Sequence, residues 1–382
     1  MRRLLIYLAL LSLGFSCTEK SQKAQELIDQ VRTKYAPDQR TALFQVEISA
    51  ENPLILHGET NLRQAKDSLL SLMQQHQIAV IDSIVVLPDE NTEKPFALIN
   101  VSVANLRSAP QHSAELATQA LLGTPVLVLK ARRGWCLVQT PDSYIAWTNE
   151  ESLQLCSRAE LERWKSVRKI IYTQTSGYAM DTLQQHRVSD LVAGNILEVK
   201  SEADDSWSIL YPDGRAALIR KSEAEEWQSW LNHTSPAESS IVEKALEFQG
   251  IPYLWGGTSA KGMDCSGFTK TVYMLQGIIL PRDASQQVYV GEPIDSVGDF
   301  SKLKTGDLLF FGSKKEDGPE RVVHVGLWLG NMQFIHASGD VHMSSMDSAS
   351  AQYDEFNRKR YLRAKRVSVS NSTEMANLFG WL

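Results

Sequence analysis

The sequence predicts an α+β multidomain protein, and its length, its composition and a change of pattern along the chain support this fold class. The chain has 382 residues, enough for two to four domains of ordinary size. Hydrophobic residues make up 43% and charged residues 22%, as in globular proteins, which excludes disorder of the whole chain. Helix and strand patterns come first, then short strands with turns, then a mixed pattern. The net charge of −6 argues against a nucleic-acid binder, which needs a basic face.

The N-terminus has the features of an export signal. Two arginines precede an apolar run from Leu4 to Phe15, and small residues lead to Cys17. The run is too short to span a bilayer as a mature helix. An ordinary N-terminal helix is the alternative, but the sequence becomes abruptly polar after Cys17. The stretch resembles a bacterial lipoprotein signal, although Gly14 stands where Leu is usual. This resemblance implies export and a lipid anchor on Cys17 at the cell envelope, in the periplasm or at the outer membrane.

The segment after the signal predicts a small α/β domain with the order α-β-β-α-β. Apolar residues recur at helical spacing in two stretches, and Asn61 is expected to cap the second. The segment carries no catalytic constellation, and His57 and His76 are interpreted as ordinary surface or edge residues. The expected elements are a helix at 20–36, strands at 44–48 and 54–58, a helix at 61–75 and a strand or strand pair at 78–87.

The middle of the chain contains an internal repeat with an offset of 71 or 72 residues. Each copy has a Gly followed by a strand, a Trp at the start of a second strand, a Pro-Asp turn and a third strand. The pattern predicts two small β-barrels, with chance similarity between two β-domains as the alternative. The first copy covers 123–128, 134–138 and 141–147, and the second covers 194–199, 206–210 and 212–218.

The repeat and the flanking patterns divide the chain into six segments. A helix with Trp227 and Trp230 ends the second barrel segment, and a helix over 238–249 opens the next domain. The last residues are interpreted as a loosely docked terminus. The expected segments are a signal at 1–17, the α/β domain at 18–95, barrels at 96–157 and 158–235, a further domain at 236–368 and a tail at 369–382.

A cysteine at the expected start of a helix is the candidate nucleophile. Asp264 is a good N-cap, so Cys265 lies in the first helical turn after the glycines of 256–257. The positive end of the helix dipole is expected to lower the pKa of the thiol, and the thiolate is the reactive form. The alternative is a buried, inert cysteine, which is unusual behind a glycine-rich loop.

Two downstream histidines provide the imidazole that a thiol nucleophile needs. His324 and His336 lie in alternating segments joined by Gly330-Asn331, a hairpin signal. A two-residue turn there would place the histidines on opposite faces, whereas an odd-length loop centred on Gly330 would pair them directly. In the second case His336 orients His324, which acts as base and then acid. Zinc binding is the competing interpretation, but the spacing lacks a short Cys pair or a clear fourth ligand.

Together these motifs resemble the NlpC-type cell-wall cysteine peptidases over about residues 238–366. The resemblance implies a papain-like NlpC-type catalytic domain, preceded by two SH3-like β-barrels and the small α/β N-terminal domain. By the same resemblance Cys265 is the nucleophile, His324 the base and His336 the orienting residue, and Tyr253 stabilises the oxyanion. No metal or other cofactor is implied. The motifs are 252–257, 264–268, 280–282, 306–311, 324–326 and 336–337.

The order of domains resembles the γ-D-glutamyl-L-diamino acid endopeptidases of the dipeptidyl-peptidase VI type. These cleave murein peptides with a free N-terminal L-Ala and release L-Ala-γ-D-Glu, so a murein peptide is the expected partner. The resemblance assigns the amine pocket to carboxylates and hydroxyls around the nucleophile, with a Tyr from the first barrel closing it. Arg282 is a candidate clamp for an α-carboxylate. The matching pocket residues are Asp264, Ser266, Tyr144, Glu115 and Ser285.

Several alternatives remain open at the level of sequence. The chain could be a non-catalytic wall-binding or scaffold lipoprotein, although the intact Cys-His-His set argues against this. It could be a general peptidoglycan hydrolase acting on intact walls, or an amide hydrolase or acyltransferase on the same scaffold. Cys136 and Cys156 could form a disulfide in an oxidising compartment or remain packed thiols.

Overall fold

The computed structural model describes residues 2–51, 53–183, 185–234, 238–314, 318, 320–368, 370 and 372–378. The chain forms two compact units. The first comprises Met1–Glu93 with Val128–Lys130 and Ser143–Ile145, and the second comprises the remainder. No helix within the described ranges is long and apolar enough to cross a membrane. The side chains of the first eighteen residues lie outside the described part, and the predicted signal and the lipid anchor on Cys17 fall there.

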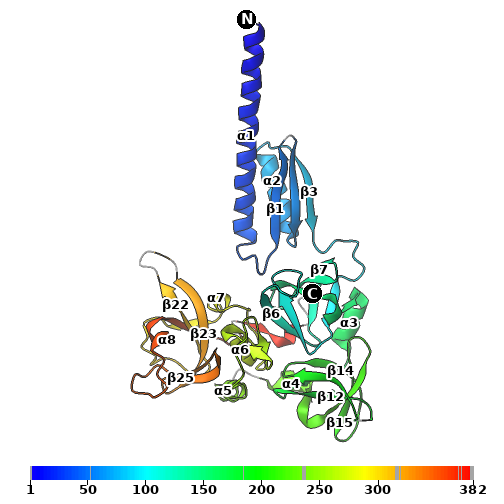
Figure 1. The fold of residues 1–382 in the computed structure, drawn as a ribbon, viewed down its shortest axis with the longest axis vertical. Helices are drawn as coiled ribbons and strands as arrows, with labels where there is room; N and C mark the ends of the chain where they lie inside the picture. The colour runs from blue at the N-terminus through cyan, green and yellow to red at the C-terminus, as the bar shows by residue number, and fades with distance from the viewer. Residues whose placement is uncertain are drawn as a thin grey trace. The chain divides into compact units, whose positions relative to one another are not determined.

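The N-terminal unit is built on a small mixed sheet with the order β1-β2-β3. Strand β2 is antiparallel to β1 and parallel to β3, and helices α1 and α2 pack on the sheet (Figure 1). Ala24, Leu27 and Leu69 are among the core residues that the helical spacing predicts. The α-β-β-α-β order is therefore confirmed. The elements are α1 (Arg2–Tyr35), β1 (Phe44–Glu51), β2 (Leu54–Thr60), α2 (Arg63–Gln75) and β3 (Val80–Val86).

One local prediction in this unit is wrong. Asn61 does not cap α2, since Leu62 occupies the cap position and makes no side-chain cap. The Asn61 Oδ1 instead accepts a hydrogen bond of 2.8 Å from the backbone N–H of Leu43, which ties the end of β2 to β1. A long-range backbone donor thus takes the oxygen that a cap would need. His57 and His76 are exposed.

The first β-domain is a sheet with the order β10-β4-β7-β8-β9-β5-β6. A short 3-10 helix, η1 (Glu150–Ser152), leads into its last strand, and helix α3 (Arg158–Ser166) follows with a capping box at Ser157. The strands are β4 (Phe96–Ile99), β5 (Val103–Arg107), β6 (Leu116–Leu121), β7 (Pro125–Arg132), β8 (Trp135–Gln139), β9 (Ile145–Asn149) and β10 (Leu153–Cys156).

The second β-domain repeats the first strand for strand. Its sheet has the order β13-β12-β16-β15-β14-β11-β17, which is the same order read from the other edge, and a short helix again follows the last strand. This equivalence confirms the two-barrel prediction from the sequence repeat. The elements are β11 (Lys169–Tyr172), β12 (Ser176–Met180), β13 (Arg187–Val192), β14 (Ile196–Glu202), β15 (Ser206–Leu210), β16 (Ala216–Arg220), η2 (Lys221–Glu223), β17 (Ala224–Glu226) and α4 (Trp227–His233).

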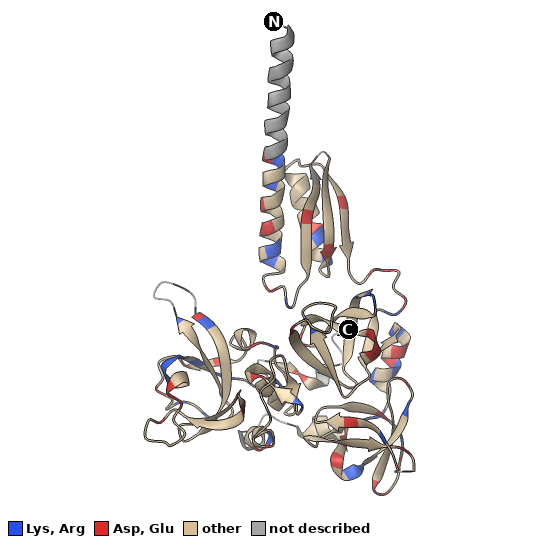
Figure 2. Ribbon diagram, in the orientation of Figure 1, with Lys and Arg blue, Asp and Glu red and all other residues tan. Residues whose placement is uncertain are grey.

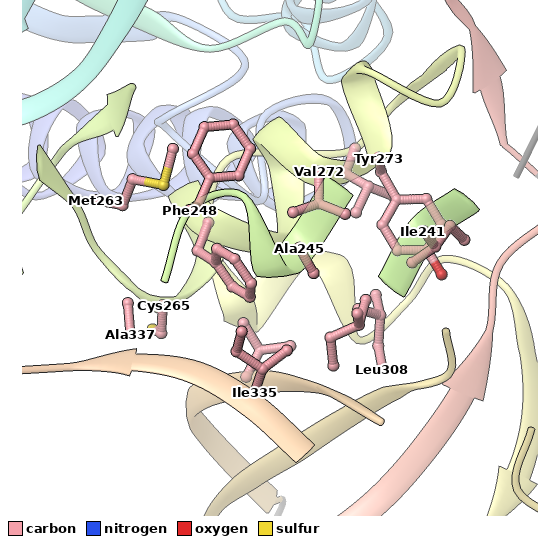
Figure 3. Close-up of a cluster of buried hydrophobic side chains, with 14 of the residues drawn as sticks. Ile241, Ala245, Phe248, Met263, Cys265, Val272, Tyr273, Leu308, Ile335 and Ala337 are labelled. Carbon is pink, nitrogen blue, oxygen red and sulfur yellow. The ribbon is translucent and has the colours of Figure 1, made fainter. Parts of the chain in front are cut away.

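The third domain combines an antiparallel sheet with helices, and this confirms the α+β class. The sheet order is β21-β26-β22-β23-β24-β25. Helix α6 packs on β23 and β24, and the buried residues between them form the core, which includes Cys265 and Ala337 (Figure 3). The strands are β21 (Glu292–Asp295), β22 (Leu308–Lys314), β23 (Glu320–Gly330), β24 (Gln333–Ser338), β25 (Asp340–Ser345) and β26 (Tyr361–Arg366). The helices are α5 (Glu238–Leu246), α6 (Cys265–Met274), α7 (Ala284–Gln287) and α8 (Glu355–Lys359).

The described end of the chain is firmly docked, contrary to the expected loose terminus. Strand β27 (Thr373–Glu374) pairs with β20 (Ile278–Ile279), and the following 3-10 helix η4 is Met375–Asn377. Met375 and Leu378 are buried in a cluster with residues of both β-domains. Two apolar side chains three residues apart, Met375 and Leu378, therefore anchor a segment whose first half is polar. Phe379 to Leu382 lie outside the described residues.

The two cysteines of the first β-domain and the distribution of charged residues also bear on the function. Cys136 and Cys156 are both free, buried thiols, and burial raises the pKa of each to about 11. They are therefore packed in the core and unreactive. Figure 2 shows acidic and basic residues distributed over the described elements of all the domains.

Candidate active site

Helix α6 begins as its sequence predicts. The Asp264 Oδ1 accepts a hydrogen bond of 2.7 Å from the backbone N–H of Gly267, so Asp264 is the N-cap and Cys265 is the first helical residue. The hairpin of β18 (Thr258–Ser259) and β19 (Gly262–Met263) leads into it. Gly267 lies so close to the backbone carbonyl of Gly257 that a Cβ would be 1.9 Å from its oxygen, which explains the glycine there.

The Asp264 carboxylate is held by a buried arginine. Arg282 is 1% exposed and binds both carboxylate oxygens, Nη2 to Oδ2 at 2.5 Å and Nη1 to Oδ1 at 3.1 Å. Its Nη1 also lies 3.0 Å from the Ser266 Oγ, and the backbone N–H of Gly256 donates to Oδ2 at 2.9 Å. The predicted role of Arg282 as an α-carboxylate clamp is wrong, because its guanidinium is buried and already engaged by the protein's own carboxylate.

The Cys265 thiol is buried and not ionised at rest. The residue is 8% exposed, and burial, with the Asp264 charge as a second cause, raises the pKa of the thiol to about 11. Backbone hydrogen bonds from Ser266 and Val325 act in the opposite direction but do not compensate. The expected lowering of the thiol pKa by the helix N-terminus is therefore wrong, because burial outweighs the dipole. The contact with Val325 places the sulfur next to the residue that follows His324.

The two histidines share one face of the sheet, but in a register that neither sequence alternative contains. The turn is Asn331-Met332, whose φ angles of 49° and 62° are both left-handed, and Gly330 pairs with Gln333 across it. A bulge at Leu329 then shifts the register, so that Leu327 pairs with Ile335. Carried along the strands, this register places Gly326 opposite His336 and makes His324 a diagonal neighbour of His336.

A chain of polar contacts leads away from His324. Its Nε2 lies 2.8 Å from the Nδ1 of His336, and the Nε2 of His336 lies 3.1 Å from the Ser344 Oγ and 3.8 Å from the Asp354 Oδ2. If Nδ1 of His324 is to accept the thiol proton, its Nε2 must carry hydrogen and donate to His336. The His336 Nε2–H then faces the hydroxyl and the carboxylate, so one set of tautomers satisfies every contact.

Both imidazoles are neutral at physiological pH. Burial lowers the pKa of His324 to about 3, with the positive charge of Arg360 as the next cause. Burial likewise lowers the pKa of His336 to about 3. A neutral thiol beside neutral imidazoles is a resting state in which the proton moves as the sulfur attacks.

Tyr253 lies near Cys265 and Asp264, and the charges of both act on its phenol. Its backbone N–H donates to the Gly339 carbonyl at 2.8 Å, which fixes the loop against the end of β24. Burial, and then the neighbouring Cys265 and Asp264, raise the pKa of the phenol, so its O–H remains a donor. A phenolic donor beside the backbone N–H of Cys265 can stabilise a developing oxyanion.

The first β-domain packs directly against the loop that precedes the nucleophile. The Trp255 indole N–H donates to the Glu115 Oε1 at 2.7 Å, and the Thr258 backbone N–H donates to the Gln119 Oε1 at 2.9 Å. A Cβ at Gly256, whose φ is +80°, would lie 2.2 Å from the Leu116 carbonyl oxygen. The structure thus brings Glu115 to the Trp255 end of the site. Within the described residues no cation pairs with Glu115.

The remaining predicted residues differ in what the structure places near them. Ser266 is buried beside Asp264 and donates to its Oδ1 at 3.2 Å. Ser285 lies half-buried on α7, which packs against α6 and β23. Tyr144 is buried, and its segment Ser143–Ile145 belongs to the N-terminal unit, so its predicted contact with the substrate stays a prediction.

Sequence reasoning missed several contributors. Trp255 and Gly326 were parts of motifs without an assigned role, and Gln119, Ser344, Asp354 and Arg360 had no local signal. The role of each residue follows only from the folded structure, in which segments distant in sequence lie side by side.

A helix-start thiol backed by two imidazoles from an antiparallel sheet defines a papain-like cysteine hydrolase. Comparison with known proteins gives the same class. The NlpC/P60 family model matches residues 250–366, and the model of the bacterial dipeptidyl-peptidase Sh3 domain matches residues 106–153. The chain belongs to the NlpC/P60 family of cysteine peptidases, and it is a cell-wall peptidase.

Three similar proteins extend the match beyond the catalytic domain. A γ-D-glutamyl-L-lysine dipeptidyl-peptidase of Bacillus cereus is 30% identical over 58% of this chain and 67% of the relative. Dipeptidyl-peptidase 6 of Lysinibacillus sphaericus is 28% identical over 67% of this chain and 94% of the relative. The crystal structure of an NlpC/P60 family protein from Bacillus cereus has a TM-score of 0.63 and 25% identity, covering 72% of this chain and 99% of that one.

Proposed function

We propose that this peptidase hydrolyses the γ-D-glutamyl bond to a diamino acid in murein peptides with a free N-terminal L-Ala, releasing L-Ala-γ-D-Glu. The observation that carries the proposal is the hydrogen bond between Glu115 of the first β-domain and Trp255 of the catalytic loop. It brings an acidic side chain from a separate domain to one end of the site. The name of the Bacillus cereus relative, a γ-D-glutamyl-L-lysine dipeptidyl-peptidase, supports the same bond, and the name of the Lysinibacillus sphaericus relative supports release of a dipeptide.

The amine subsite follows from the charges at that end. Asp264 is offset by its bidentate Arg282, whereas Glu115 has only the neutral indole as a partner in the described part of the chain. Glu115 is therefore the carboxylate best able to bind an ammonium group. We propose that Glu115 supplies the charge, that Asp264 and Ser266 shape the pocket beside the nucleophile, and that Tyr144 and Ser285 complete its wall.

The proposed reaction uses the contact chain in order. His324 takes the proton of Cys265 as the sulfur attacks the γ-carbonyl carbon of D-Glu, and the oxyanion is stabilised by Tyr253 and the Cys265 N–H. His336 orients the His324 imidazolium through their hydrogen bond, and Asp354 lies beyond His336 at the end of this series of contacts. The proton then passes to the departing amine of the diamino acid, and water hydrolyses the thioester by the same route.

The decisive experiment compares L-Ala-γ-D-Glu-L-Lys with its N-acetyl form at equal concentration, with products identified by mass. Acetylation removes a charge and adds bulk in a partly dry pocket, which should cost about 2–5 kcal/mol, or roughly 30-fold to several-thousand-fold in rate. Glu115→Gln should lose most of this preference, and the exposed Glu151→Gln in the same domain should keep it. Equal rates on both peptides would favour a general wall hydrolase, and no cleavage of either would favour a non-catalytic role.

We also propose that the chain is exported and lipidated on Cys17, and that it trims released peptides at the envelope. The support is the N-terminal sequence pattern. Expression of the full chain and of Cys17→Ser in a bacterial host, followed by detergent phase partitioning, tests this. The native chain should enter the detergent phase, and the variant should lose the acyl-dependent part. Identical partitioning would contradict lipidation.

A further inference from the structure

The charged side chain of Arg360 lies at the catalytic centre and has no role in the chemistry described so far. Arg360 follows α8 and precedes β26, and its side chain is half-buried. Its Nε donates to the Asn357 Oδ1 at 2.9 Å, and its guanidinium carbon lies 4.1 Å from the ring centroid of the exposed Phe356. Within the described residues, no hydrogen-bond or ion-pair partner is found for its Nη1 and Nη2.

A continuous set of contacts ties Arg360 to the histidine pair. The Asp354 carboxylate, 3.8 Å from the His336 Nε2, accepts hydrogen bonds from the backbone and the side-chain amide of Asn357. Asn357 is 3% exposed and in turn holds the Arg360 Nε. The guanidinium is therefore a fixed part of the catalytic centre, although its two outer nitrogens remain available.

The sheet places Arg360 across the site from the amine pocket. In one row across the strands, Pro252 bridges to Asp340, Asp340 pairs with Ser338, and the β23–β24 register brings Ser338 opposite His324. His324 pairs with Phe311, and Phe311 pairs with Tyr361, the residue after Arg360. The Tyr253 loop and Arg360 thus stand at the two ends of this row, with His324 between them.

Electrostatics agree with this position. The Arg360 charge is the second cause, after burial, of the lowered pKa of His324, and it also depresses the pKa of His336. The charge of the Cys265 thiolate in turn acts to raise the pKa of the Arg360 guanidinium. A cation that influences both reacting groups is close enough to meet a substrate bound to them.

We propose that Arg360 is a specificity residue that binds the free α-carboxylate of the diamino acid on the leaving side of the scissile bond. The proposal rests on the proposed function, because that substrate enters with its ammonium at the Glu115 end and extends past His324. A guanidinium with two free N–H groups side by side matches a carboxylate in bidentate geometry. The enzyme would then prefer peptides that end at the diamino acid, since a further residue replaces the carboxylate with an amide.

The test measures kcat/KM for L-Ala-γ-D-Glu-L-Lys and for its C-terminal amide. The native enzyme should prefer the acid by about 10-fold to 100-fold, the range for hydrogen bonds to a charged group. Arg360→Gln should reduce the ratio of acid to amide to near one while leaving the preference for a free N-terminus intact. Arg360→Lys, which keeps the charge without the fork, should give an intermediate ratio.

Arg358→Gln is the matched control, because Arg358 lies on α8, two residues before Arg360, and its guanidinium packs on Phe300. It should keep the native ratio. Equal rates on acid and amide in the native enzyme, or an Arg360→Gln variant that loses activity equally on both, would overturn the proposal. The second result would mean that Arg360 acts only through the histidines.

A second readout separates this inference from the proposed function. Alkylation of Cys265 by iodoacetamide is followed in the presence of the acid or the amide peptide, and the acid should protect at lower concentration. In the Arg360→Gln variant, the acid and the amide peptide should protect Cys265 equally well. If neither peptide is cleaved, the proposed function fails, and the protection experiment still decides whether Arg360 recognises the carboxylate.

Discussion

The Nε2 of His324 lies 2.8 Å from the Nδ1 of His336, although the two residues are diagonal and not opposite neighbours in the sheet. The bulge at Leu329 makes this possible. Without the bulge, the pairing of Gly330 with Gln333 would continue unchanged, and the histidines would project from opposite faces. One extra residue in the strand thus aligns the imidazoles.

Gly326 completes the arrangement, because it stands opposite His336. A Cβ there would lie 2.9 Å from the Phe334 ring and 3.3 Å from the His336 Cβ. We predict that Gly326→Ala lowers kcat by about 10-fold or more and the stability by about 1–3 kcal/mol. Steady-state kinetics and chemical denaturation measure the two effects. An unchanged kcat would show that the site tolerates movement of His336.

Loss of the nucleophile or of its base should abolish peptide hydrolysis. Cys265→Ala and His324→Ala should each reduce kcat by about 10⁴-fold or more, and the double variant should be no worse, because the two residues act in one proton transfer. His336→Ala should be milder, since water can partly replace an orienting group. Cys136→Ala, which removes a buried thiol in the first β-domain, is the control. Substantial turnover by Cys265→Ala would remove the cysteine-peptidase mechanism.

The raised pKa of the Cys265 thiol predicts how alkylation depends on pH. A group with a pKa of about 11 is protonated at neutral pH, so its reaction with iodoacetamide should accelerate about tenfold per pH unit between pH 6 and pH 9. The rate is measured by the mass of the proteolytic fragment that contains Cys265, which separates its alkylation from that of Cys17, Cys136 and Cys156. A plateau across that range would instead indicate a thiolate–imidazolium pair already formed at rest.

The buried histidines predict a loss of stability in acid. Unfolded histidine has a pKa near 6.5, whereas His324 and His336 have folded pKa values of about 3. The unfolded chain therefore binds more protons between these values, and stability falls as the pH drops from about 6.5 toward 3. At pH 5 each histidine should lower the free energy of unfolding by on the order of 2 kcal/mol relative to neutral pH. Denaturation of the native protein and of His336→Gln at pH 7.5 and pH 5 checks this, and an equal loss in both would contradict it.

A buried ion pair holds the first β-domain to helix α6. The Lys270 Nζ lies 2.7 Å from the Asp142 Oδ2, and both side chains are largely buried. Lys270→Met should cost about 3–5 kcal/mol because it leaves Asp142 charged and unpaired, and adding Asp142→Asn should restore much of that. Lys244→Met breaks the more exposed pair with Glu247 and should cost below about 0.5 kcal/mol. Similar losses for both lysines would contradict the argument.

Local signals were sufficient where the structure depends on neighbouring residues. The N-cap at Asp264 and the helix start at Cys265 follow from a few adjacent residues, and the equivalence of the two β-domains follows from their sequence repeat. Asn61 shows the limit, since its oxygen was taken by a donor 18 residues away. A propensity describes what a side chain prefers locally, and long-range contacts override it.

The sequence predicted which residues the candidate site brings together better than it predicted their electrostatics. It singled out Cys265 and the two histidines that the structure places in contact, but it assigned Arg282 to the pocket and expected a lowered pKa for the thiol. Both errors have one cause, because burial cannot be read from spacing alone: Arg282 is 1% exposed and Cys265 is 8% exposed. Asp354 and Arg360 reach the centre through pairings that no short motif encodes.

The two β-domains also hold the hairpin that leads to Cys265 from equivalent positions of their repeat. Gln119 and Asp190 are 71 residues apart, the offset of the repeat, and both hold the hairpin that leads to Cys265. Gln119 accepts from Thr258 and Ser259, and Asp190 pairs with Lys261. A duplicated ancestral module would have offered the same attachment point twice. After duplication one copy could acquire Glu115, where its twin has His186, while the other continued to brace the same hairpin.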